Sequence, residues 1–172
     1  LGAPPVREAL ARLAEASRQM GEGMGRLAQA GAELTARHGC PDALGGFGKA
    51  PFDTVADTLR GTRGALLDLY RHPDKLLAAS AALVPSSIDM AVGQASPAAP
   101  PLVVMPLHKG ACGFMSFKQF QKFYWPSLQR VLEGIIAAGM VPYLFVEGTY
   151  DEPRLAHIAA SGLPAVRARG TK

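Results

Sequence analysis

Residues 102–146 read LVVMPLHKGACGFMSFKQFQKFYWPSLQRVLEGIIAAGMVPYLFV. The continuous apolar runs Leu102–Met105 and Val141–Val146 are typical of strands buried on both faces. Between them, Ser116 and Gln119 have the spacing of a capping box, which predicts a helix that extends to Gly139. A strand, a helix and a second strand in this order predict two parallel strands joined by a right-handed crossover. The stretch therefore indicates an α/β fold.

The flanking sequence supplies few further strands. Residues 43–47 read as a short strand end, and Asp53 is placed to cap a helix that reaches Leu59. Asp151 begins another helix, which ends near Gly162. A sheet of two or three parallel strands exposes its edges and cannot bury these helices. We therefore expect that more strands belong to the complete fold and that this chain is an incomplete segment of it.

A long amphipathic helix is expected at the N-terminus. Pro4 and Pro5 suit the first helical turn, where a missing N–H is tolerated. Apolar residues then recur three, four or seven positions apart; they are Val6, Leu10, Leu13, Met20, Met24, Leu27 and Leu34. We expect two parts, an N-terminal helical segment over residues 1–40 and an α/β part over residues 41–172.

Composition and charge exclude several classes of protein. The net charge is +4 with histidine neutral, and the basic residues are mixed with acidic ones rather than gathered in a stripe, so no nucleic-acid partner is expected. No apolar run approaches the length of a membrane span, so no membrane partner is expected. Cys40 and Cys112 stand in a chain without secretory features. This favours reduced cysteines and a cytoplasmic protein, with a single disulfide as the alternative.

Three motifs in order resemble the uroporphyrinogen decarboxylase superfamily. They are Gly46–Asp53 followed by Leu59–Gly61, then Asp68–Leu77, then Gly113–Pro126 with its aromatic residues. The likeness runs from about Gly45 to Gly162. It implies a (β/α)8 TIM barrel, of which this chain would be an incomplete segment preceded by its N-terminal helical region.

In such a barrel the chemistry lies at the carboxyl ends of the strands. Here those ends correspond to the loops Phe47–Asp57, His108–Met115 and Glu147–Tyr150. The resemblance therefore implies Glu147, His108 and Asp57 as catalytic residues. A carboxylate or an imidazole at such a position can accept or donate a proton, although each residue could instead form ion pairs or be solvated.

Neighbouring cations are candidates for binding an anionic substrate. They are Lys109, Lys49 and Arg60, each of which could also be a solvated surface residue. Glu147 and His108 are in addition the candidate metal ligands. Cys112 is a weaker candidate, because a lone cysteine in a glycine-rich loop is more often a small packing residue.

The sequence also departs from the family pattern. It lacks the arginine-rich motif that true decarboxylases carry near the N-terminus. Asp57 stands at the position of the family's loop tyrosine, and Gly110 lies near that of its loop serine. The methyltransferase branch has a His-x-Cys zinc pair where this chain has Phe145 and Glu147, which does not favour a thiolate-rich zinc site.

Three functions follow from the resemblance. The first is a decarboxylase, a carbon–carbon lyase of tetrapyrrole metabolism that needs no cofactor. The second is a corrinoid-dependent methyltransferase, which would require zinc, a methyl donor and a corrinoid protein as partner. The third is an inactive barrel fragment.

Overall fold

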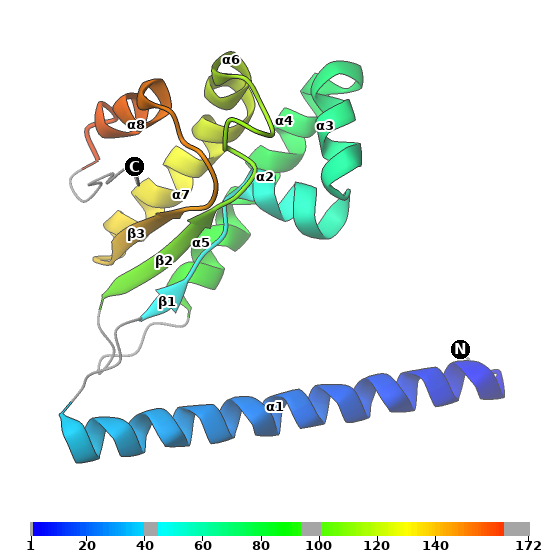
Figure 1. Ribbon diagram of the computed structural model, residues 1–172. Coiled ribbons are helices and arrows are strands. Elements are labelled where there is room, and N and C mark those ends of the chain that lie inside the picture. Colours follow the sequence, from blue (N-terminus) through cyan, green and yellow to red (C-terminus); the bar gives the residue numbers. More distant parts are fainter. Residues whose placement is uncertain (1, 40–44, 94–100, 164–172) are drawn as a thin grey trace. The chain divides into compact units, whose positions relative to one another are not determined.

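A computed structural model describes residues 2–39, 45–93 and 101–163. Its internal contacts divide the chain into two units, Leu1–Asp42 and Ala43–Lys172. Figure 1 shows the elements of both units. Each unit is described below by itself.

The first unit is the helix α1 (Pro4–His38), which is continuous over 35 residues. It ends at Gly39, whose φ of 66° is left-handed and whose N–H donates to the carbonyl of Thr35. None of the helical residues is buried. The predicted apolar stripe is therefore present but exposed within this unit.

The second unit is built on a three-stranded sheet in the order β1 (Gly46–Phe47), β2 (Leu102–Leu107), β3 (Val141–Val146). All neighbouring strands are parallel, and β2 pairs with β3 from Leu102↔Val141 to Leu107↔Val146. The predicted adjacent parallel strands are thus confirmed. Among the described residues the structure shows an α/β fold with a small parallel sheet, and it shows no closed barrel.

Helices connect the strands and lie mostly against one face of the sheet (Figure 1). Between β1 and β2 the chain forms α2 (Pro51–Thr54), the π-helical turn η1 (Val55–Leu59), α3 (Thr62–Arg71), α4 (Pro73–Ala82) and α5 (Val84–Val92). Between β2 and β3 it forms α6 (Phe117–Gln119), the π-helical turn η2 (Phe120–Tyr124) and α7 (Trp125–Ala137), and α8 (Glu152–Ala159) follows β3.

The local signals explain most of these boundaries. The capping box of Ser116 and Gln119 is confirmed, with both reciprocal hydrogen bonds present. Asp151 caps α8 by accepting the N–H of Arg154. The prediction that Asp53 is a helix cap is wrong: α2 begins two residues earlier at Pro51, so the Asp53 side chain lies inside the helix and serves another purpose.

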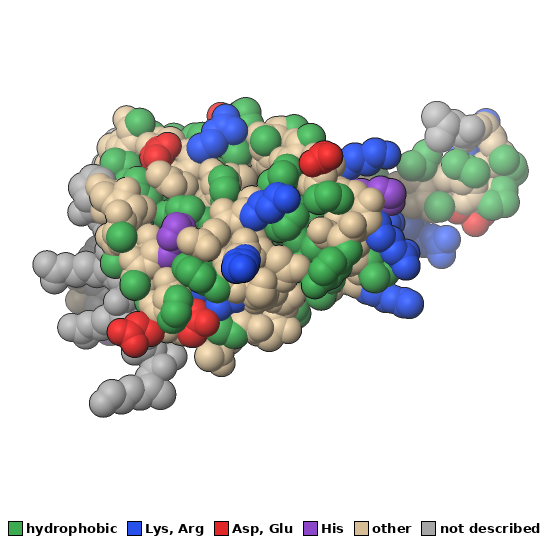
Figure 2. Space-filling model, turned by 90° about the horizontal axis from the view of Figure 1, so that it is seen from above, with side chains coloured by type: hydrophobic (Ala, Val, Ile, Leu, Met, Phe, Trp, Pro, Cys, Tyr) green, Lys and Arg blue, Asp and Glu red, His purple; other side chains and the backbone are tan. Residues whose placement is uncertain are grey.

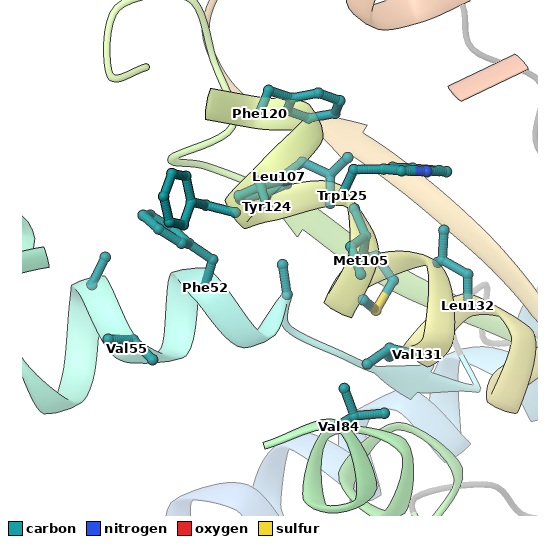
Figure 3. Close-up of a cluster of buried hydrophobic side chains, with 14 of the residues drawn as sticks. Phe52, Val55, Val84, Met105, Leu107, Phe120, Tyr124, Trp125, Val131 and Leu132 are labelled. Atoms are coloured by element: carbon teal, nitrogen blue, oxygen red, sulfur yellow. The ribbon is translucent and has the colours of Figure 1, made fainter. Parts of the chain in front are cut away.

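The core lies between one face of the sheet and the helices (Figure 3). Val103, Met105 and Leu107 alternate along β2 toward this side and are fully buried. Helices α7, α5 and α2 supply the buried side chains around them, among them Val131, Leu132, Ile135, Val84 and Phe52. Burial of each such side chain stabilises the fold by about 1.5–3 kcal/mol.

The opposite face of the sheet is apolar and open. Phe47 of β1 is 45% exposed, and Tyr143 and Phe145 of β3 are 52% and 51% exposed. The strand register places Val104 beside Tyr143 and Pro106 beside Phe145, and both β2 residues are only half-buried. An apolar sheet face of this kind agrees with the expectation that more strands belong to the complete fold.

One described stretch, Pro73–Val92, has the length and a mean hydropathy, 1.3, that would permit a membrane span. This stretch comprises α4 and α5, which Leu83 separates. Leu76, Val84 and Ala91 from it belong to the core, and 28% of its most apolar window is buried.

The open sheet face predicts strong binding of a hydrophobic dye by the 172-residue chain. Tyr143→Gln combined with Phe145→Gln should reduce the dye fluorescence, because these are the two most exposed aromatic residues on that face. The matched control is Leu67→Gln with Tyr70→Gln on α3, which removes exposed apolar side chains elsewhere and should change the signal less. A soluble monomer that binds no dye and unfolds in one cooperative thermal transition would contradict this prediction.

Candidate functional site

The loops that follow the strands meet at the carboxyl edge of the sheet, because all the strands are parallel. A cavity of about 220 Å³ lies there. Its lining residues are Phe47, Lys49, Asp57, Pro106, His108 and Glu147. The structure thus brings together four of the residues singled out from the sequence, while Phe47 and Pro106 add apolar walls.

Asp57 is the centre of the polar cluster. Its Oδ2 lies 2.9 Å from Nζ of Lys49 and 3.3 Å from Nδ1 of His108, and its Oδ1 lies 3.2 Å from Nζ of Lys109. Burial raises the pKa of Asp57, but hydrogen bonds from Lys49, Lys109 and His108 outweigh burial and hold the pKa below its usual value. The carboxylate is therefore ionised at neutral pH.

The His108 ring contacts two charged neighbours. Nδ1 lies 3.3 Å from Oδ2 of Asp57, and Nζ of Lys109 lies 3.1 Å from Nε2 and 3.2 Å from Nδ1. A carboxylate only accepts hydrogen bonds and an ammonium only donates them. Asp57 and Lys109 together fix the position of the ring.

Lys109 does not line the cavity. The residue is 5% exposed, and its ammonium lies 4.5 Å from the centre of the Phe114 ring. Its contacts with Asp57 and His108 place it behind the pocket. The structure thus puts Lys49 at the pocket surface and Lys109 in the layer that supports it.

A second carboxylate, Asp53, lies beneath this cluster and is fully buried. It accepts hydrogen bonds from the hydroxyl of Tyr124 at 2.6 Å and from the backbone N–H groups of Lys109 at 2.8 Å and His108 at 3.1 Å. Burial, the largest influence, raises the pKa of Asp53, and these hydrogen bonds oppose it. Burial also raises the pKa of Tyr124 well above its ordinary value, so the phenol stays protonated and donates.

The two other residues predicted from the sequence take different positions. Glu147 is exposed at the rim of the cavity, where its N–H donates to the carbonyl of Leu107, and its carboxylate makes no ion pair with any residue in the described part of the chain. Arg60 does not line the cavity. Its guanidinium binds the Asp68 carboxylate on α3, with N–O distances of 2.8 and 3.3 Å.

Arg154 is a buried residue near the site that the sequence did not reveal. Its guanidinium donates to the carbonyls of Gly110, at 2.9 Å, and Met115, and it pairs with Asp151 at 2.8 Å. It also lies 3.2 Å from the sulfur of Cys112. Arg154 thereby fixes the loop between β2 and α6 from α8, a tertiary role that an arginine in an ordinary amphipathic helix does not signal.

Gly110 is required by close packing in this loop. A Cβ atom there would lie 2.5 Å from the Tyr150 hydroxyl and 2.8 Å from Cε1 of Tyr124. Tyr124 donates a hydrogen bond to Asp53, and the absence of a side chain at Gly110 lets the loop pack closely against this buried pair.

The polar cluster does not fit the zinc ion that the methyltransferase branch would need. Within residues 2–39, 45–93 and 101–163, no three His, Cys, Asp or Glu side chains are grouped to hold a metal. The Lys109 ammonium lies within 3.2 Å of both His108 ring nitrogens and would repel a cation there. Cys112 is a free cysteine, whereas Cys40 lies outside the described residues.

Charge around the site is mixed rather than strongly positive. The cavity is lined by one lysine, two carboxylates and one histidine, and Lys109 adds a second cation behind it. Basic, acidic and apolar side chains are also interspersed on the face of the molecule shown in Figure 2. The absence of a nucleic-acid partner stays a prediction.

Comparison with known proteins gives one result. A family model described as uroporphyrinogen decarboxylase (URO-D) matches residues 2–168, which is nearly the whole chain. No curated protein and no solved structure matches it.

Asp57→Asn should make the stability of the chain less dependent on pH. The pKa of Asp57 lies below its unfolded value of about 3.9, so the ionised carboxylate contributes stability above that pH. The contribution is lost as the pH falls through the folded-state pKa. Urea unfolding should therefore show the variant less stable than the parent at about pH 7, with the gap shrinking below about pH 4. A gap that is constant over this range would contradict the ion-pair geometry.

Gly110→Ala should destabilise the second unit by about 1–3 kcal/mol, because the added methyl group overpacks against Tyr150 and Tyr124. Gly113→Ala is the matched control, since a Cβ at that loop position meets no atom within 4 Å. Denaturant unfolding of both variants measures the difference. Equal stability of the two would show that the loop does not pack as closely as described.

Proposed function

The chain belongs to the uroporphyrinogen decarboxylase (URO-D) family, and from this premise we propose that its strand-end pocket binds a carboxylate-bearing substrate for decarboxylation. The reaction would be that of a carbon–carbon lyase in tetrapyrrole metabolism. The observation that carries the proposal is the convergence of Lys49, Asp57 and His108 on one cavity.

A decarboxylase needs a cation that binds and orients a carboxylate of the substrate, and a proton for the carbon from which CO₂ departs. When the C–C bond breaks, its electron pair stays on that carbon, CO₂ departs, and a proton completes the new C–H bond. Lys49 is the lysine that lines the cavity, so it suits the carboxylate. His108 also lines the cavity and is oriented by Asp57, so it suits proton delivery.

The size and charge of the pocket limit how much of a substrate it can hold. A cavity of about 220 Å³ accommodates one carboxylate side chain rather than a whole tetrapyrrole. Asp57 already neutralises Lys49, so a bound carboxylate would share that cation rather than meet a free one. The walls formed by Phe47 and Pro106 suit the apolar part of the substrate next to the carboxylate.

The direct test is conversion of uroporphyrinogen by the 172-residue chain, followed by chromatography of the oxidised products. Lys49→Met removes the cation that binds the carboxylate and should raise KM. His108→Gln should lower turnover by at least about tenfold, the usual scale for loss of an acid/base group. Glu147→Gln should do the same if the rim carboxylate takes part. Arg60→Met is the matched control, because it removes a cation that pairs with Asp68 outside the cavity.

Other outcomes would favour the other functions. Methyl transfer to a corrinoid protein, with one zinc bound per chain, would replace the proposal by the methyltransferase alternative. Absence of both reactions in the soluble, folded chain would indicate an inactive barrel fragment.

A further inference from the structure

We infer that Asp53, held by Tyr124, is a positioning residue that fixes His108 and Lys109 at the edge of the pocket. The first two residues after β2, His108 and Lys109, donate their backbone N–H groups to Asp53. These hydrogen bonds therefore set the direction in which the chain leaves the strand. The catalytic consequence rests on the proposed function, whereas the positioning itself does not.

The carboxylate of Asp53 accepts three hydrogen bonds. Oδ1 accepts the N–H of Lys109, and Oδ2 accepts both the N–H of His108 and the hydroxyl of Tyr124. No cation in the described part of the chain pairs with it, so these dipoles replace a counter-ion. Two successive backbone N–H groups directed at one anion form a small anion-binding nest.

Asp53 acts together with Asp57 from one helical segment. The residues are four positions apart on the continuous run of α2 and η1, so their side chains lie on the same side of it. Asp53 accepts hydrogen bonds from the backbone N–H groups of His108 and Lys109, while Asp57 pairs with their side chains. Two carboxylates one helical turn apart therefore fix both the backbone and the side chains of these two residues.

This arrangement makes Asp53 a positioning residue and not a catalytic one. Its side chain is fully buried and does not line the cavity, so it cannot touch a substrate. Burial of a carboxylate costs desolvation free energy. An apolar side chain of similar volume would pack at this position at least as well. What the carboxylate adds is a fixed geometry for the loop.

Two variants test the inference at the loop itself. Asp53→Asn keeps the shape, but its amide group turns a donor toward the three donors that converge there. Tyr124→Phe removes only the hydroxyl and keeps the ring, which packs 5.8 Å from Phe52 and 5.5 Å from Phe120. Ser127→Ala is the control, since it removes another buried hydroxyl, bonded to the Tyr124 carbonyl, without touching the loop.

The readout is amide hydrogen exchange by NMR at fixed pH, with the chemical shifts of the His108 ring. In the parent chain the amides of His108 and Lys109 should be protected, and Asp53→Asn should speed their exchange by about tenfold or more relative to the amides within β2. Tyr124→Phe should also speed the exchange of these two amides, and it should shift the His108 ring signals. This variant decides the test if Asp53→Asn fails to fold. Ser127→Ala should leave both readouts unchanged.

If Asp53 contributed only to overall stability, Asp53→Asn and Tyr124→Phe would accelerate exchange equally at His108, at Lys109 and throughout β2. That result would overturn the inference. So would unprotected His108 and Lys109 amides in the parent chain. If uroporphyrinogen is converted, Tyr124→Phe should also lower kcat by about tenfold with little change in KM. If it is not converted, the proposed function fails while the exchange result still decides the positioning.

Discussion

The parallel pairing of β2 with β3 is the constraint on which the rest of the second unit depends. A parallel ladder requires a crossover, and α6, η2 and α7 supply it and bury Val103, Met105 and Leu107 beneath them. The same ladder sends the carboxyl ends of the strands to one edge. Side chains far apart in sequence therefore meet there without any local signal that links them.

The open face of the sheet follows from the same topology. In the described part of the second unit the helices lie mostly against one side, so Phe47, Tyr143 and Phe145 are exposed on the other. In a (β/α)8 barrel the corresponding face is the barrel interior, which side chains from further strands fill. The cavity stands where this face meets the strand-end loops, with apolar walls from Phe47 and Pro106 and a polar end at Asp57.

Local and periodic signals made much of this fold predictable. The apolar runs and the capping box predicted the parallel strands and their crossover. The strand ends, together with the family likeness, singled out Lys49, Asp57 and His108, which the structure brings to one cavity.

The sequence did not predict the hydrogen bonds between buried polar residues. Asp53 stands near a helix start, where an aspartate usually caps, and only its partners 55 and 71 residues away reveal its role. Arg154 looks like a surface residue in sequence, yet it is buried and fixes a loop 39 to 44 residues distant. Arg60 pairs with its neighbour Asp68 and does not line the cavity, an ion pair that the sequence did not distinguish from a substrate contact. Such networks depend on tertiary contacts that periodicity does not encode.

The most direct measurement of the central claim is amide NMR mapping of propionate, a small molecule that carries one carboxylate, onto the 172-residue chain. The account predicts that the largest shift changes fall on Lys49, Asp57 and His108, that Lys49→Met removes them, and that Arg60→Met retains them. Changes spread evenly over the basic side chains of the surface, or equal in the two variants, would contradict a carboxylate site at the strand ends.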